Sequence, residues 1–289
     1  MEDWNDYLLI LALYRAKTLR GASLMLGTTH TTVARRLALL HKRRQGVVFE
    51  KYSSGYRPTP LGQQLITVAQ RVEQVVVTAD RIDRAKGDAL AGPITLSLAE
   101  AMAQYLLLAP LAEFAKRYPE ISLNIDCSTK VVNLDKSEAD IAIRAVNILP
   151  DHLVGRRLFA YALSYYSQHA YFSDTPPEKR RWIAPSTQEV WPEWLADSPF
   201  PEVPIGLTIS DIVTRFKALE AGHGMSRAAC FMADNHPNLI RLPGAKVLQQ
   251  PDIWVLTHPD LRESPRIKLL MQYLVDALHS KKALLTGCE

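Results

Sequence analysis

A repeat of apolar residues between Leu61 and Ile82 limits the fold of this 289-residue sequence more than any other feature. The repeat advances by four and three residues in turn, which keeps a period of about 3.5 residues. Its members are Leu61, Leu65, Val68, Val72, Val75, Ala79 and Ile82. A helix that packs on its own domain drifts from this period, whereas a coiled-coil seam keeps it. The sequence predicts a long helix from about Pro60 that pairs with a second copy; packing on its own domain is the alternative.

Positive charge is concentrated before this helix. Residues 1–62 contain ten Lys and Arg against four Asp and Glu, a net charge of +6, while the other 227 residues carry −2. A basic head on a nearly neutral body favours a polyanionic partner at one end of the molecule. A solvated basic surface without a partner has the same charge, so motifs must decide between the two.

Three helical segments precede the long helix. The first spans residues 4–16, and the second spans Leu19–Leu26 with Thr18 as its cap and Gly27 at its end. The third spans His30–Arg44, with Thr28 and Thr29 at the N-cap. On the third helix Val33, Leu37 and Leu40 form one apolar stripe, while Thr31, Arg35 and Lys42 project from the other face. This arrangement is typical of a helix-turn-helix. Arg44 falls on the apolar stripe, so either the helix ends early or Arg44 snorkels over the core.

A small hairpin follows the third helix. Residues 47–52 have a β-like pattern, Ser53-Ser54-Gly55 forms a turn, and residues 56–59 return. The pattern predicts a wing beside the third helix, with Arg57 placed to contact a phosphate or a minor groove.

Strands and helices alternate after the linker at Lys86-Gly87 and Ala91-Gly92-Pro93. The expected strands are 94–98, 121–126, 140–144, 203–209, 239–242 and 253–257. The expected helices are 101–118, which tolerates Pro110, then 210–221 and 264–278. This alternation predicts parallel sheets covered by helices, with a ligand at the carboxyl ends of the strands. About 195 residues would suit two small α/β lobes separated by a cleft.

The chain resembles the LysR-type transcriptional regulators, a bacterial family, over almost its whole length. The strongest similarity lies in Thr18-Leu-Arg-Gly-Ala-Ser-Leu-Met-Leu26 and Thr28-Thr-His-Thr-Thr-Val-Ala-Arg-Arg-Leu37. Weaker similarity continues through Gly92-Pro93-Ile-Thr-Leu96, Phe114-Ala-Lys-Arg-Tyr-Pro119, Ala139-Asp-Ile-Ala-Ile143 and Glu220-Ala-Gly-His-Gly224. The chain departs from the family at Ala34, where a serine is usual, at Arg44-Gln45, and at Met225-Ser226, where Leu-Pro is common.

The resemblance implies an α/β multidomain chain in three parts. These are a winged helix-turn-helix over 1–62, a dimerising linker helix and hinge over 63–92, and a two-lobed effector-binding domain over 93–289 that resembles periplasmic binding proteins. Lobe I is expected over about 93–160 and 258–289, and lobe II over about 161–257. Such proteins bind promoter DNA as homodimers or homotetramers, and a small molecule changes their arrangement.

Candidate site residues follow from these placements. We expect Thr31, Thr32, Arg35 and Arg36 to contact bases in the groove, and Thr29, His30 and Arg57 to contact phosphate. By position at strand ends and helix starts, the effector candidates are Ala99, Glu100, Ser128, Thr129, Ser210 and Ser226. Ser210 is equally well explained as a plain N-cap, and Glu100, if it faces the cleft, favours a neutral or cationic effector.

Other functions find little support in the sequence. The eight histidines are scattered, and the three cysteines lack metal-ligand spacing, so we expect no enzyme, metal or cofactor. Cys127 and Cys230 are more readily explained as inert thiols than as a redox switch. No apolar run reaches membrane-spanning length and the N-terminus is acidic, so we expect a cytoplasmic protein without a membrane partner. A ligand-binding protein or enzyme with an accessory DNA-binding head is the alternative function.

Overall fold

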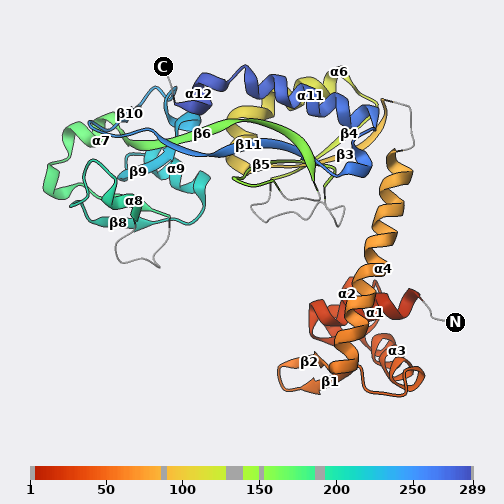
Figure 1. The fold of residues 1–289 in the computed structure, drawn as a ribbon. Helices are drawn as coiled ribbons and strands as arrows, with labels where there is room; N and C mark the ends of the chain where they lie inside the picture. Colours follow the sequence, from red (N-terminus) through yellow and green to blue (C-terminus); the bar gives the residue numbers. More distant parts are fainter. Residues whose placement is uncertain (1–3, 86–89, 128–138, 150–152, 186–192, 288–289) are drawn as a thin grey trace. The chain divides into compact units, whose positions relative to one another are not determined.

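The computed structural model describes residues 4–85, 90–127, 139–149, 153–185 and 193–287. Within the long helix it does not describe the side chains of residues 74, 77, 78 and 80–85. The chain divides into two compact units, residues 1–83 and 84–289, and each is described by itself (Figure 1).

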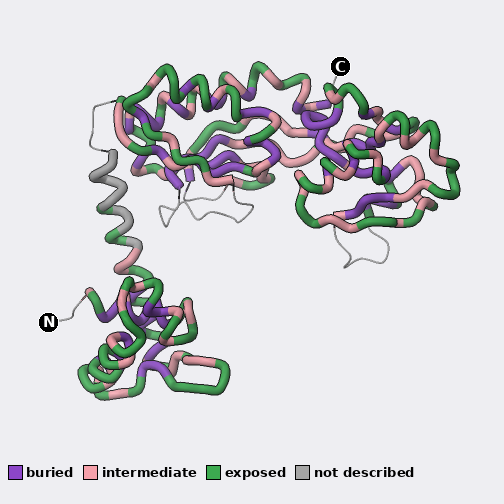
Figure 2. Tube along the Cα trace, turned by 180° about the vertical axis from the view of Figure 1, so that it is seen from behind, coloured by how far each residue is buried: buried purple, intermediate pink, exposed green. Residues whose placement is uncertain are grey.

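Three helices form the first unit's core, as the sequence predicts. They are α1 (Trp4–Ala16), α2 (Leu19–Met25) and α3 (His30–Arg43). The Thr18 hydroxyl caps α2 by accepting the Gly21 N–H, and Gly27 leaves the helix with φ +60°. The apolar stripe of α3, Val33, Leu37 and Leu40, is buried. Buried residues gather where the helices meet, and the outer turns of α3 are exposed (Figure 2).

Of the two explanations offered for Arg44, the structure supports the second, because the helix ends only one residue before its expected end and not a full turn. The helix α3 ends at Arg43, and Arg44 is its C-cap residue. The half-buried Arg44 side chain lies over the ring of Tyr7, with 5.8 Å between the guanidinium carbon and the ring centroid. The neighbouring Arg43 donates to the buried carboxylate of Asp6 at 2.6 Å, which ties the end of α3 to α1.

The predicted wing is present as an antiparallel hairpin of β1 (Phe49–Tyr52) and β2 (Gly55–Pro58). The N–H of Tyr56 donates to the carbonyl of Lys17 at 2.7 Å, which fixes the wing to the turn between α1 and α2. Gly55 has φ +120°, and a Cβ there would lie 2.4 Å from the Lys17 oxygen. Only glycine allows this close approach.

The long helix α4 (Pro60–Ala85) begins where the sequence predicts. Thr59 caps it by accepting the Gly62 N–H at 3.1 Å, while its own hydroxyl donates to the carbonyl of Val47 at 2.6 Å. Leu65, Ile66 and Ala69 are buried in the core of the first unit. That core therefore reaches past residue 62, the expected end of the DNA-binding domain.

The second unit is built on one nine-stranded sheet in the order β4-β3-β5-β11-β6-β9-β7-β8, with β10 paired to β6. The strands are β3 (Gly92–Ser97), β4 (Ile121–Asp126), β5 (Ile141–Ala145), β6 (Val154–Gln168), β7 (Trp182–Ala184), β8 (Ile205–Thr208), β9 (Met225–Ala229), β10 (Leu239–Arg241) and β11 (Leu248–Thr257). The helices are α5 (Glu100–Met102), a π-helical turn (Ala103–Leu107), α6 (Leu108–Arg117), α7 (His169–Asp174), α8 (Glu193–Ala196), α9 (Ile212–Glu220), α10 (Cys230–Ala233), α11 (Pro265–His279) and α12 (Lys282–Thr286). Single 3₁₀ turns cover Pro177–Lys179 and Pro259–Leu261.

The expectation of purely parallel sheets is wrong. Pairing is parallel at each end, where β3 lies between β4 and β5 and where β7 lies between β8 and β9. The two long strands β6 and β11 run antiparallel to each other and to their outer neighbours β9 and β5. They carry the chain between the two ends of the sheet, which correspond to the two lobes.

Helices and core residues complete the second unit. Helices α6 and α11 lie together along one face of the sheet (Figure 1). The π-helical turn precedes Pro110, which has no N–H to donate to the preceding turn. Tyr165, Trp182 and Trp194 pack together as core in lobe II. Within the described ranges, no helix is both long enough and apolar enough to span a bilayer.

Candidate functional site

Helix α3 presents a polar surface opposite its buried stripe. His30, Thr31, Arg35 and Arg36 are exposed, and Thr32 is half-buried at the margin of this surface. The first turn of an α-helix leaves its N–H groups without intrahelical acceptors and carries partial positive charge. The exposed face therefore combines hydroxyls, guanidinium groups and helix-end amides, which are the groups that contact DNA bases and phosphates.

Thr29 has a more specific role than the sequence indicates. Its hydroxyl accepts the Thr32 N–H at 3.2 Å and lies 2.9 Å from the hydroxyls of both Thr31 and Thr32. The three threonines thus form one hydrogen-bonded group at the start of α3. The hydroxyl of Thr29 is used in capping, so a phosphate at this position would be met mainly by helix-end amides.

The wing carries a second exposed cation. The guanidinium carbon of Arg57 lies 5.1 Å from the centroid of the Tyr52 ring, and its Nη2 lies 3.4 Å from the Ser54 hydroxyl. The Tyr52 hydroxyl in turn donates to Glu50 at 2.8 Å. Stacking on the ring holds the Arg57 side chain along the wing while leaving it exposed.

Among the described residues of the head, Arg15 and Arg43 pair with internal carboxylates. Arg15 forms a two-point contact with Glu73 at 2.9 and 2.6 Å, which joins α1 to α4, and Arg43 pairs with Asp6. Within the described ranges, no ion pair involves Arg35, Arg36 or Arg57. The positive charge of α3 and the wing is therefore available to an external polyanion.

A second site lies in the other unit, in a cleft of about 360 Å³ between the two ends of the sheet. We call this pocket the cleft. Its walls come from lobe I, from the long strand β6 and from lobe II, and it is lined by Ala99, Ala101, Met102, Ile143, Arg144, Ala145, Tyr161, Leu163, Ile183, Pro185, Trp194, Ile212, Arg215, Ser226, Arg227, Ala228, Ala229, Phe231 and Gln250. This volume is within the range of small-molecule sites.

The predicted effector residues reach the cleft only in part. Ala99 and Ser226 line it, but the Ser226 hydroxyl donates to the carbonyl of Ile183 at 3.0 Å. Glu100 does not line it and accepts a hydrogen bond from Gln104. Ser128 and Thr129 lie outside the described residues.

Ser210 is neither a cleft residue nor the cap of its helix. The N-cap of α9 is Asp211, whose carboxylate accepts the Thr214 N–H at 2.7 Å. These contacts with Thr214 lower the pKa of Asp211. The side chain of Asp211 therefore supplies the negative charge at this helix N-terminus, which argues against a bound anion there.

The sequence reasoning missed three arginines that line the cleft, Arg144, Arg215 and Arg227, which we call the cleft arginines. Arg144 donates to the carbonyl and hydroxyl of Ser97 at 3.1 and 2.7 Å. Arg215 donates to the carbonyl of Ile209 at 2.7 Å, and the guanidinium of Arg227 lies 5.8 Å from the Trp194 ring centroid. Arg144 is the last residue of the predicted strand 140–144, so its place at a strand's carboxyl end was a usable signal.

Burial and mutual repulsion act on these cations. Burial lowers the pKa of Arg144, and the negative charge of Asp126 opposes this shift. Burial also lowers the pKa of Arg215, and the positive charge of Arg227 lowers it further. Arginine has so high a pKa that Arg144 and Arg215 stay charged at neutral pH.

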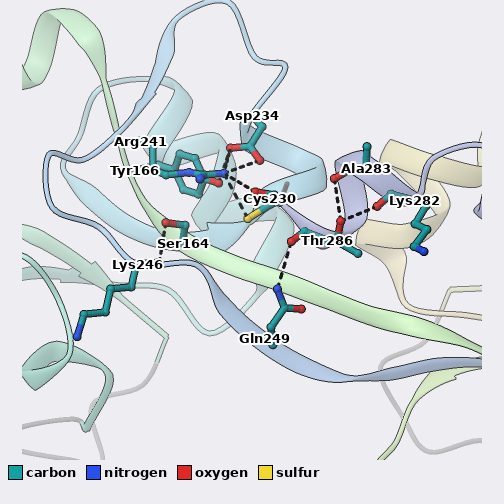
Figure 3. A network of polar contacts seen from close by, with 11 residues as sticks. Ser164, Tyr166, Cys230, Asp234, Arg241, Lys246, Gln249, Lys282, Ala283 and Thr286 are labelled. Atoms are coloured by element: carbon teal, nitrogen blue, oxygen red, sulfur yellow. Dashed lines mark hydrogen bonds and ion pairs between the residues drawn. The ribbon is translucent and has the colours of Figure 1, made fainter. Parts of the chain in front are cut away.

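The described cysteines do not have the surroundings of reactive thiols. Burial raises the pKa of Cys127 and of Cys230. Cys230 lies beside a closed polar network, in which Asp234 accepts from Tyr166 at 2.7 Å and from Arg241 at 2.9 Å (Figure 3). A redox switch needs an accessible, low-pKa thiol, so these surroundings favour the inert interpretation. The described part of the chain contains no cluster of three metal-ligating side chains.

Two other grooves are larger, at about 730 Å³ each, and each of them contains a carboxylate that pairs with one of its cations. One contains Lys268 and Glu263, which pair at 2.6 Å, and the other contains the Asp234–Arg241 pair. The cleft is smaller and has three cations of one sign, which makes it the better candidate for a ligand.

Comparison with known proteins agrees with this architecture. The model of the LysR substrate binding domain family matches residues 87–279, more than half of the chain. The chain belongs to the LysR family. Among curated relatives, the Mau operon transcriptional activator of Paracoccus denitrificans is 32% identical over 146 residues, which cover 49% of this chain and 50% of that protein. This LysR-family chain spans about half the length of the curated relatives it matches.

Solved structures of full-length LysR-type regulators share the fold. CrgA from Neisseria meningitidis, a LysR-type transcriptional regulator, matches with a TM-score of 0.58 at 20% identity, covering 96% of this chain and 99% of that one. The virulence activator AphB of Vibrio cholerae matches with a TM-score of 0.59 at 14% identity, covering 95% and 99%. These likenesses show that nearly the whole chain shares the fold of these two proteins.

Proposed function

We propose that this chain is a transcriptional regulator that binds double-stranded promoter DNA and responds to a small molecule in the cleft. The observation that carries the proposal is the exposed face of α3, where Thr31, Arg35 and Arg36 surround a helix N-terminus and Arg57 stands on the adjoining wing. In a winged helix-turn-helix such a face enters the major groove and the wing contacts the flanking backbone. Thr29, His30 and Thr32 complete the proposed DNA surface.

We further propose that the protein acts as a homodimer or homotetramer joined through α4. Leu61 and Leu65 pack on the core of their own unit, so they contribute less to a seam than the sequence predicts. Val68 and Val75 are 42% and 68% exposed in the single chain, and Ala79 is exposed as well. With Val72 they leave an apolar stripe that a second copy can cover. The Ile82 side chain lies outside the described residues.

The relatives are transcriptional regulators, and we propose that this chain likewise has no catalytic role and works in the cytoplasm, where bacterial DNA is accessible. The alternative is a ligand-binding protein or enzyme with an accessory head. It does not explain why Arg35, Arg36 and Arg57 are exposed and form no ion pair within the described ranges.

DNA affinity measured across a salt series tests the proposal on the full chain, together with its mass in solution. Release of counterions from several phosphates should give a steep fall in affinity with salt. The mass should be that of a dimer or tetramer. A monomer that does not bind duplex DNA at low ionic strength would refute the proposal.

A further inference from the structure

The charge in the cleft is one-sided. Arg144 on β5, Arg215 on α9 and Arg227 on β9 line it, and none of its described lining residues is an Asp or Glu. Across the described ranges, no ion pair joins a carboxylate to Arg215 or Arg227. Asp126 acts on Arg144 and Asp211 on Arg215, but neither carboxylate lines the cleft. Partly buried cations with so little counter-charge are costly, so a ligand that brings negative charge into this cavity would be favoured.

Arg215 and Arg227 are the two cleft arginines of lobe II. They are close enough for the charge of one to act on the other, and both are half-buried. Arg215 is held in place from behind, because its Nη1 donates to the carbonyls of Ile209 and Ser210 at 2.7 and 3.2 Å. A guanidinium has five N–H donors, so these two bonds leave donors for an anion. A guanidinium with free N–H donors matches the two oxygens of a carboxylate, and Arg215 and Arg227 both line this cavity.

The remaining walls of the cleft are apolar. Met102 and Ile143 come from lobe I, while Ile183, Trp194 and Phe231 come from lobe II. The guanidinium of Arg227 lies over the ring of Trp194, which holds the cation next to an apolar surface. A ligand with an anionic end and an apolar body could contact the arginines with the first and the apolar side chains with the second.

We propose that the cleft binds a small organic carboxylate, with its anionic group between Arg215 and Arg227 and its apolar body against Met102, Trp194 and Phe231. Arg144 reaches the same cleft from lobe I, so it adds positive charge on the opposite wall. This inference rests on the proposed regulator function and names the chemical class of its effector. It replaces the neutral or cationic effector that Glu100 suggested, since Glu100 does not line the cleft.

Calorimetry on the full chain without DNA tests this class with matched probes. These are 3-phenylpropanoate and 4-methylpentanoate, each compared with its neutral amide of nearly the same shape. At least one acid should bind about ten- to a hundredfold more tightly than its amide, as expected for charge-assisted hydrogen bonds. Arg215→Gln and Arg227→Gln should each reduce acid binding by a similar factor. Failure of both acids to bind at millimolar concentration, or equal affinity for acid and amide, would overturn the proposal.

Arg262→Gln is the matched control, because it removes one charge from the same unit at a side chain that is 70% exposed and outside the cleft. It should leave acid binding unchanged. Thermal unfolding should show that Arg227→Gln remains folded, so that a loss of acid binding reports on the cleft and not on the fold. DNA binding by these variants is measured separately: its absence from the parent chain would refute the regulator function, whereas acid binding tests only the cleft.

Discussion

Replacement of Arg35 by alanine should weaken binding to the cognate DNA site by about 1–3 kcal/mol, roughly a 5- to 150-fold increase in Kd. Arg35 is exposed on α3, and no carboxylate among the described residues forms an ion pair with it. No internal ion pair is therefore lost on substitution, and the cost should fall on the complex alone. The free energy of unfolding should change by less than about 0.5 kcal/mol, as is usual for exposed positions.

Fluorescence anisotropy with the cognate site, a set of single-base variants and a salt series separates the possible contacts of Arg35. A guanidinium that reads a guanine edge gives lower discrimination at one base position after substitution. A guanidinium that touches only phosphate gives uniform weakening and a salt slope reduced by about one. Arg117→Ala, at an exposed arginine of α6, is the control and should change neither quantity. Unchanged DNA affinity in Arg35→Ala would refute the placement of α3 in the groove.

Three further substitutions test how the head is built and how copies associate. Leu40→Ala removes a fully buried side chain and should cost about 2–5 kcal/mol in the free energy of unfolding, measured by denaturant titration. Gly55→Ala should lower the free energy of unfolding more than Gly27→Ala does. The Cβ at residue 55 would lie 2.4 Å from a carbonyl oxygen, whereas the Cβ at residue 27 would meet only open space at a left-handed φ. Equal losses of stability would contradict the wing contact. Val75→Lys should shift the oligomer toward monomer in sedimentation without lowering the stability of the head, since this side chain is 68% exposed; an unchanged mass would contradict the seam.

The helix-turn-helix was predictable because its signals are local. Thr18 and Thr29 cap the helices that they precede in the sequence, and each apolar residue of the α3 stripe is buried. Each of these features depends on residues three or four apart, which the sequence displays directly. The seam of α4 was harder to interpret, because periodicity identifies an apolar stripe but not the surface that covers it. Part of that stripe packs on its own unit.

The sheet of the second unit was less predictable because its longest strands depend on distant partners. The strand β6 was missed: its burial does not alternate regularly, and Arg156 and Arg157 near its start look like loop residues. Its neighbours β9 and β11 lie tens of residues away in sequence. When β6 and the full length of β11 are not recognised, the alternation of shorter strands and helices suggests a purely parallel sheet.

The cleft arginines could not be found from spacing alone. They come from three elements at residues 144, 215 and 227, and only the folded sheet brings them to one cavity. The polar residues chosen from strand ends and helix starts contribute less to the cleft. Ser210 does not line it and precedes the actual cap of α9, Asp211, while the Ser226 hydroxyl donates to the carbonyl of Ile183 on a neighbouring strand. Short polar side chains at such positions satisfy the backbone first, so they are weak indicators of a ligand site.

Footprinting of the purified full chain on genomic DNA tests the central claim most directly. If α3 enters the major groove and two copies join through α4, protection should cover two half-sites whose centres lie about 10 base pairs, or a multiple of this, apart on one face of the duplex. Arg35→Ala should lose this pattern at protein concentrations where the parent chain shows it. Protection of a single isolated site, or no protection at low salt, would contradict the claim.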